Sequence, residues 1–310
     1  MTAGTTPIAT ELAEDRFAGL DTWAPEAILA ALLDGQKRAL AAVGPAIPAL
    51  AEAARIAAER LAAGGRLVYL AAGSPALISL GDALEIPQTY GIGREQILPI
   101  LAGGATITSD LAGPAEDDGP LAASEVAAAR IGPADCVVAV SASGSTPYTV
   151  AGLAAARRAG AATVALAGNP GAPIFASADV AVLLETGPEV ISGSTRMGAG
   201  TAQKAALNML STLIGVQLGH VHDGLMVNVR ADNDKLRQRA ARIVARIAGI
   251  SEPAGFAALE ASGGAVKPAI LLAAGAESPD EADAMLAAAG GHVRAALARL
   301  AEARRRRDLS

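Results

Sequence analysis

Short apolar segments alternate with helical segments through the first two thirds of the chain, and this alternation limits the possible folds most strongly. Each apolar segment ends in a loop of glycine, serine or proline residues, which is typical of a strand bounded by turns. Strands that alternate with helices form βαβ units and a mostly parallel sheet. The fold class is therefore α/β, and the predicted strands are residues 66–71, 97–101, 135–140, 162–167 and 180–184.

Helices are predicted where apolar residues recur at helical spacing. Residues 25–63 form one such region with a break near Gly44 and Pro45, Pro147 opens a second, and long helices follow Gly193 and cover 232–248. From residue 251 onward, short alanine-rich helical segments are separated by glycines and no strand pattern recurs. We therefore predict an N-terminal helical segment (1–63) packed on an α/β core domain (64–250), and a small helical C-terminal domain (251–310).

Composition excludes several classes of protein. The 310 residues carry a net charge of −6, which argues against a nucleic-acid surface. Apolar stretches are interrupted by charges, glycine or proline before they reach about 18 residues, so a membrane span is not expected. The acidic N-terminus lacks a secretory signal. The single cysteine, Cys136, lies in a predicted strand and is interpreted as a core thiol, and three histidines do not make a histidine-rich metal site. A soluble, cytoplasmic protein is expected.

The loop after the third predicted strand is the strongest local motif. It reads SASGSTP at 141–147, where Gly144 permits a tight turn and Pro147 suits the first position of a helix after Thr146 as N-cap. Serine hydroxyls and free backbone N–H groups then converge at the positive end of a helix, a geometry that suits a phosphate. Gly73 and Ser74 occupy the equivalent place after the first strand. The alternative is an ordinary serine-rich helix cap.

Three glutamates lie in settings that favour chemistry: Glu85 beside Ile86 and Pro87, Glu116 in an acidic turn, and Glu189 after a Gly-Pro pair. Two carboxylates in different environments can divide the roles of acid and base, because burial raises the pKa of one and hydrogen bonding lowers that of the other. A helix cap or a solvated turn is the alternative for each residue taken alone.

A longer pattern carries a family resemblance. The run GSTRMGAGTAQK at 193–204 continues as LNMLST at 207–212, and it is accompanied by GPEV at 187–190, AEDD at 115–118, GLMV at 224–227 and the serine loop. Together these resemble the N-acetylmuramic acid 6-phosphate etherases, from about residue 10 to the C-terminus. The resemblance implies the sugar isomerase (SIS) fold, with three layers and a phosphosugar-binding core domain. It also implies a homodimer with the site near the interface, and no metal or other cofactor.

The activity implied by the resemblance is elimination. Ring opening of the sugar phosphate makes the hydrogen on C2 acidic, one carboxylate removes it, and a second group protonates the lactyl oxygen as it leaves C3. Water then adds, giving N-acetylglucosamine 6-phosphate and D-lactate. The family's two glutamates correspond to Glu85 as acid and Glu116 as base. The residues assigned to substrate binding are Gly73, Ser74, Ser141, Ser143, Gly144, Ser145, Thr146, Glu189, Ser194, Arg196 and Lys204.

The first loop departs from the family pattern. Where the family has Gly-Thr-Ser-Gly-Arg, this chain continues from Gly73 and Ser74 with Pro75, Ala76 and Leu77, so a fixed guanidinium near Glu85 is lost. The change leads to the hypothesis that the substrate is a sugar phosphate without the lactyl carboxylate. Two further interpretations remain open: a phosphosugar isomerase and a non-catalytic sugar-phosphate regulator.

Overall fold

The computed structural model describes residues 9–104, 113–229, 231 and 233–307. Packing divides the chain into two compact units. We call Met1–Leu84 with Arg94–Ser211 the core unit, and Glu85–Gly93 with Thr212–Ser310 the C-terminal unit.

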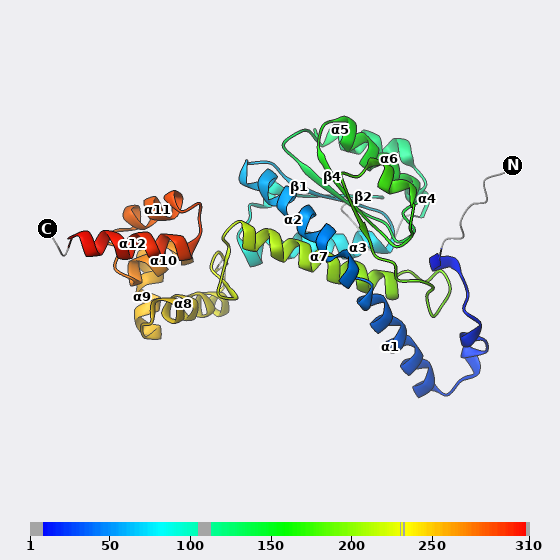
Figure 1. The fold of residues 1–310 in the computed structure, drawn as a ribbon, viewed down its shortest axis with the longest axis horizontal. Helices are drawn as coiled ribbons and strands as arrows, with labels where there is room; N and C mark the ends of the chain where they lie inside the picture. Colours follow the sequence, from blue (N-terminus) through cyan, green and yellow to red (C-terminus); the bar gives the residue numbers. More distant parts are fainter. Residues whose placement is uncertain (1–8, 105–112, 230, 232, 308–310) are drawn as a thin grey trace. The chain divides into compact units, whose positions relative to one another are not determined.

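The core unit is built on a five-stranded parallel sheet of order β2-β1-β3-β4-β5 (Figure 1). The five predicted strands are confirmed, with ends that differ by at most one residue. Every residue in β1, β3 and β4 is buried, which explains why these segments are almost entirely apolar. The strands are β1 Leu67–Ala71, β2 Ile97–Leu101, β3 Cys136–Val140, β4 Ala162–Ala167 and β5 Val180–Leu183. Cys136 is buried, and its burial raises the pKa of the thiol to about 12, which confirms the core assignment.

Helices cover both faces of this sheet (Figure 1). On one face, α5 and α6 pack on alternate residues of β1, including Val68 and Leu70. On the other, α2 packs on β1, β3, β4 and β5, and α3 is joined to β1 by a hydrogen bond from the Tyr69 hydroxyl to Asp82. The result is the predicted three-layer α/β fold. Its α-helices are α1 Pro25–Ala41, α2 Ile47–Ala62, α3 Ser74–Tyr90, α4 Gly113–Glu116, α5 Gly119–Ala128, α6 Pro147–Arg158 and α7 Gly198–Gln217.

Short 3₁₀ turns complete the core unit. One of them, η4 Gly44–Ala46, breaks the first helical region where the Gly-Pro pair predicted a break. The others are η1 Ala9–Glu11, η2 Asp15–Phe17, η3 Leu20–Thr22, η5 Arg94–Gln96 and η6 Pro173–Ser177.

The first helical region, Pro25–Ala62, is long and apolar enough by composition to cross a membrane. Its second half nevertheless behaves as a core helix, because α2 buries small side chains such as Ala53, Ala54 and Ala57 completely. Alanines let the helix approach the sheet closely, and the charged side chains of Glu52 and Arg55 lie on its exposed face. These contacts make α2 a core helix of the α/β unit.

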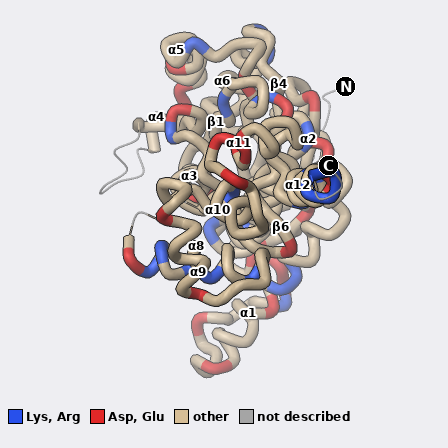
Figure 2. Tube along the Cα trace, turned by 90° about the vertical axis from the view of Figure 1, so that its left-hand side faces the viewer, with Lys and Arg blue, Asp and Glu red and all other residues tan. Residues whose placement is uncertain are grey.

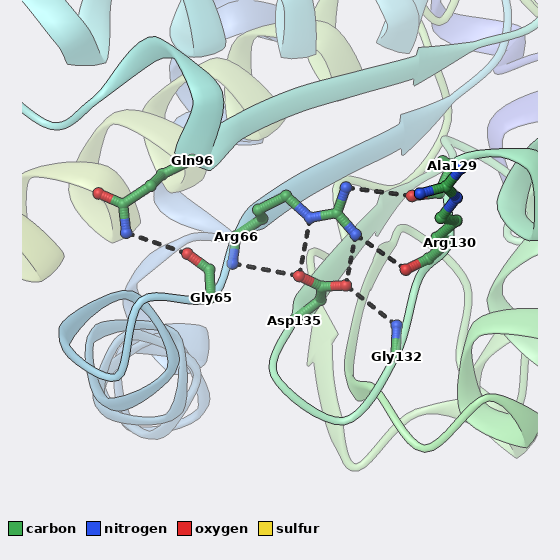
Figure 3. Close-up of polar contacts among 7 residues, drawn as sticks. All are labelled: Gly65, Arg66, Gln96, Ala129, Arg130, Gly132 and Asp135. Carbon is green, nitrogen blue, oxygen red and sulfur yellow. Dashed lines mark hydrogen bonds and ion pairs between the residues drawn. The ribbon is translucent and has the colours of Figure 1, made fainter.

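The amino ends of β1 and β3 are joined by a partly buried ion pair between Arg66 and Asp135 (Figure 3). The Arg66 guanidinium donates from Nε to one Asp135 oxygen at 2.9 Å and from Nη2 to the other at 2.8 Å, and the backbone N–H groups of Arg66 and Gly132 add two more donors. Arg66 also reaches the carbonyls of Ala129 and Arg130. Every donor nitrogen of this guanidinium is thus satisfied within the protein, which makes it a structural clamp at the edge opposite the loops 72–74 and 141–147.

The C-terminal unit is helical and has its own hydrophobic core. Its α8 buries Ala240, Ile243 and Val244 against α9 and α10, so packing groups this helix with the C-terminal helices. The predicted domain boundary at residue 250 rests only on the change in the sequence to short alanine-rich helical segments separated by glycines. The basic run at the end of the chain forms the last turn of α12 (Figure 2). The elements are α8 Asp234–Ala248, α9 Glu252–Ala261, α10 Val266–Ala273, α11 Pro279–Ala288, α12 Val293–Arg307, and a hairpin of β6 Val221–His222 and β7 Leu225–Met226.

Candidate functional site

The loop after β1 is a tight turn into α3. Gly73 has a φ of +62°, a left-handed conformation that favours glycine, and Ser74 is the first residue of α3. The sheet register pairs Ala71 with Val140, the last residue of β3, so this turn lies beside the serine loop. Both loops lie at the carboxyl edge of the sheet, where parallel sheets bind ligands.

The serine loop, residues 141–146, is organised by its own hydroxyl groups. The Ser141 hydroxyl accepts the N–H of Gly144 at 3.0 Å and shares a 3.0 Å hydrogen bond with the Thr146 hydroxyl. Ser143 accepts both the N–H and the hydroxyl of Ser145, at 3.1 and 3.0 Å. These bonds fix the loop in one compact shape. Thr146 is the N-cap of α6 as predicted, but its side chain does not cap the helix, so the first N–H groups of α6 are left for an anion.

The chain after β4 supports the serine loop. The Asn169 amide donates to the carbonyl of Ser143 at 3.0 Å, and the N–H of Ile174 donates to the carbonyl of Gly144 at 3.0 Å. A Cβ on Gly144 would lie 2.5 Å from Ala172 Cβ, so only glycine fits there. Asn169 therefore supports the site, a role that the sequence did not predict.

Glu116 lies against the turn after β1. It ends the short helix α4, which packs beside α6, and a Cβ on Gly73 would be only 2.8 and 2.9 Å from its two carboxylate oxygens. The absent side chain of Gly73 is thus the space that the carboxylate fills. Partial burial raises the pKa of Glu116, and the negative charge of Asp117 raises it further. A half-buried carboxylate of raised pKa beside a phosphate-type loop is suited to proton transfer.

Glu85 is exposed on α3, one turn after Asp82. Asp82 is buried and accepts three hydrogen bonds, from Tyr69 Oη and Asn208 Nδ2 at 2.6 Å each and from Ser211 Oγ at 3.0 Å. This network fixes α3 to β1 and α7 and so holds the helix that carries Glu85. Glu85 belongs to the C-terminal unit and Glu116 to the core unit. That the two carboxylates lie close enough to act on one substrate stays a prediction.

The remaining predicted residues lie around the start of α7. Both oxygens of Glu189 accept backbone N–H groups, from Gly198 and Ala199 at 2.8 Å each, so this buried carboxylate caps α7. Ser194 and Arg196 lie in the turn that precedes the helix. Lys204 is exposed on α7 and donates to Asn208 Oδ1 at 2.6 Å.

The structure thus brings together the turn at Gly73, the carboxylate of Glu116 and the serine loop. The Asp82 network was missed by the sequence reasoning, although a lone aspartate between apolar neighbours on a helix is a signal for a buried acceptor. Within the described residues, no group of three or more His, Cys, Asp and Glu side chains is arranged to hold a metal ion.

The fold and these loops define a sugar isomerase (SIS) domain, and residues 119–213 match the SIS domain family. A solved structure similar in fold is a putative phosphosugar isomerase from Bacteroides fragilis, with a TM-score of 0.51 and 19% identity over 64% of this chain and 93% of that one.

Sequence relatives are much more similar. The N-acetylmuramic acid 6-phosphate etherase of Deinococcus radiodurans is 46% identical over 94% of this chain and 96% of that protein. The protein of the same name from Mycolicibacterium smegmatis is 41% identical over 94% of this chain and 97% of its own length. The chain belongs to the N-acetylmuramic acid 6-phosphate etherase family, as the sequence motifs predicted.

Proposed function

We propose that this protein is a carbon–oxygen lyase that cleaves the D-lactyl ether of N-acetylmuramic acid 6-phosphate. The products are N-acetylglucosamine 6-phosphate and D-lactate. Besides family membership, one observation carries the proposal: the half-buried carboxylate of Glu116 fills the space above Gly73, next to the serine loop. That arrangement joins a base to a phosphate-binding loop at the ligand-binding edge of a parallel sheet.

The serine loop holds the phosphate in this proposal. Ser143, Ser145 and Thr146 supply hydroxyl groups, and the uncapped N-terminus of α6 supplies backbone N–H groups and a positive partial charge. Arg196 and Lys204 add positive charge for the phosphate or for the lactyl carboxylate. Both side chains are exposed, which leaves them accessible to a ligand. No metal ion or cofactor takes part in the proposed reaction.

The proposed chemistry is elimination followed by hydration. In the open-chain aldehyde, Glu116 takes the proton from C2, and the C3–O bond breaks as Glu85 gives a proton to the lactyl oxygen. Water then returns a hydroxyl to C3 and a proton to C2, which balances the reaction. The raised pKa of Glu116 makes it a stronger base than an ordinary carboxylate once it is ionised.

We further propose a homodimer whose interface includes the exposed face of α3. Leu77 and Leu84, two turns apart on this helix, are 46% and 59% exposed, and Glu85 follows directly. Apolar side chains around a catalytic carboxylate favour cover by another protein surface, because a second copy would remove them from water. A soluble protein of the cytoplasm, without nucleic-acid or membrane partners, is the proposed setting.

A second candidate is a sugar-phosphate binder without turnover. It is favoured by Leu77, whose exposed apolar side chain stands where the etherase pattern has arginine. Activity as a phosphosugar isomerase agrees less well with the sequence, because the chain retains both glutamates that elimination requires.

The test is incubation with N-acetylmuramic acid 6-phosphate and an enzymatic assay of D-lactate. The variants E116Q and E85Q are each expected to lower release at least about a hundredfold, within the range of general acid–base catalysis. The matched control is E95Q, an exposed glutamate in η5 before β2, which is expected to keep the wild-type rate. Full activity in E116Q would remove that residue from the mechanism. Binding of the sugar phosphate without any release by the wild type would favour the binder.

A further inference from the structure

Two helical hairpins of the C-terminal unit share a sequence pattern. The segments GGAVKPAIL at 263–271 and GGHVRAALA at 290–298 each place two glycines ahead of a helix. All four glycines have positive φ, at +65° and +89° in the first pair and +60° and +79° in the second, and α10 and α12 begin two residues after them. The second position of each helix is a cation, Lys267 in α10 and Arg294 in α12. The two copies provide an internal comparison.

The two cations differ in their surroundings. Arg294 is exposed and forms an ion pair with Asp223. Lys267 is only 8% exposed, and no hydrogen bond or ion pair joins its ammonium group to any of the described residues. Burial lowers the pKa of Lys267 to about 8, and no carboxylate opposes this shift. A buried cation without a counter-charge is costly to the folded protein unless a ligand supplies the charge.

Lys267 lines a cavity within the C-terminal unit that has a volume of about 800 Å³. This volume lies in the range of small-molecule sites. The Gly263-Gly264 turn, the N-terminus of α10 and Arg237 of α8 form other parts of the wall. No side chain caps α10, so its first N–H groups have no partner from a capping residue. Glu260 also lines the cavity and provides an acceptor for a hydroxyl group.

We propose that this cavity is a second anion site, which binds the phosphate group of a small molecule at the N-terminus of α10. Lys267 supplies the counter-charge, Arg237 a second cation, and the backbone N–H groups of α10 hydrogen bonds to phosphate oxygens. Every residue involved belongs to the C-terminal unit and none is assigned to the lyase reaction. The site therefore stands independently of the proposed function, and its ligand is either free phosphate or a phosphate ester.

Hydrogen–deuterium exchange of the full-length protein tests the proposal with local resolution. Inorganic phosphate and N-acetylglucosamine 6-phosphate are titrated separately, and exchange is followed in peptides that cover residues 260–272 and, for the serine loop, 141–150. Slower exchange at 260–272 is expected with at least one ligand. A response to both identifies the phosphate group itself as the ligand, and a response to the ester alone shows that the sugar is also recognised. The serine-loop peptide reports separately on the proposed active site.

The decisive variant is K267M, because methionine keeps the apolar stem and removes only the buried charge. It is expected to fold at least as stably as the wild type, which thermal unfolding verifies, and to weaken the response at 260–272 at least about tenfold. The matched control R294M removes the equivalent cation of the second hairpin and is expected to respond like the wild type. No slowing at 260–272 with either ligand, or an unchanged response in K267M, would overturn the proposal.

Discussion

Replacing Gly73 by alanine tests whether the turn after β1 sets the position of the Glu116 carboxylate. The new Cβ would lie 2.8 and 2.9 Å from the two carboxylate oxygens, whereas ordinary contacts begin at 3.4 Å. The carboxylate must therefore move by at least about 0.5 Å, since its flexible side chain yields more easily than the backbone. Because a displacement of about 1 Å can cost about a hundredfold in rate, the kcat of D-lactate release is expected to fall about ten- to a hundredfold.

Backbone strain has to be separated from this displacement. Alanine at a φ of +62° costs about 1–2 kcal/mol, which lowers the Tm by about 2–8 °C in a domain of this size. Gly64, before β1 at the other edge of the sheet, has a φ of +84°, and a Cβ added there would have no atom within 4 Å among the described residues. G64A is therefore expected to lose similar stability and keep its rate. A G73A variant as fast as G64A would show that the turn after β1 does not set the position of the Glu116 carboxylate.

Three further predictions concern carboxylates. D135N is expected to lose about 2 kcal/mol in thermal unfolding, because the partly buried Arg66 guanidinium loses its charged hydrogen-bond partner. Burial raises the pKa of Asp135, but hydrogen bonds from Arg66 and a backbone N–H outweigh burial and leave the pKa lowered. The wild type is therefore more stable than D135N by the full difference above the unfolded-state pKa of about 4. This difference in the free energy of unfolding disappears as the pH falls through the lower folded-state pKa. D82N places an amide donor among three donors, so both Tm and kcat should fall. An unchanged Tm would show that this hydrogen-bond network does not stabilise the fold. D117N removes a charge that raises the pKa of Glu116, so the acidic limb of the pH profile of kcat/KM should move to lower pH, and a limb that stays in place would contradict the assignment of Glu116 as base.

Local patterns in the sequence predict most of the core unit. The central strands of the sheet are recognisable because burial on both faces makes them almost entirely apolar, and Gly-Ser loops mark the carboxyl ends of β1 and β3. The same loops predict the phosphate-type motif, since a strand, a glycine turn and a helix start fix its geometry locally. Glu116 is recognisable as a candidate, but its position against Gly73 depends on the fold.

Features that depend on distant contacts were not predictable from spacing. Asp82 and Ser211 are 129 positions apart and meet only because α3 and α7 pack together. For Glu189 the sequence leaves a helix cap and a substrate-binding role open, and the structure shows that both of its carboxylate oxygens cap α7. The packing of α8 with the C-terminal helices likewise depends on which helices its apolar face contacts, and the local sequence pattern does not specify those helices.

The proposed reaction cleaves the ether by elimination and hydration. Reaction of N-acetylmuramic acid 6-phosphate in water labelled with ¹⁸O, followed by mass spectrometry of both products, tests it most directly. Elimination breaks the bond between C3 and the lactyl oxygen, so the label is expected on the C3 hydroxyl of N-acetylglucosamine 6-phosphate, with D-lactate unlabelled. Label in the lactate, or no release of D-lactate at all, would contradict the account.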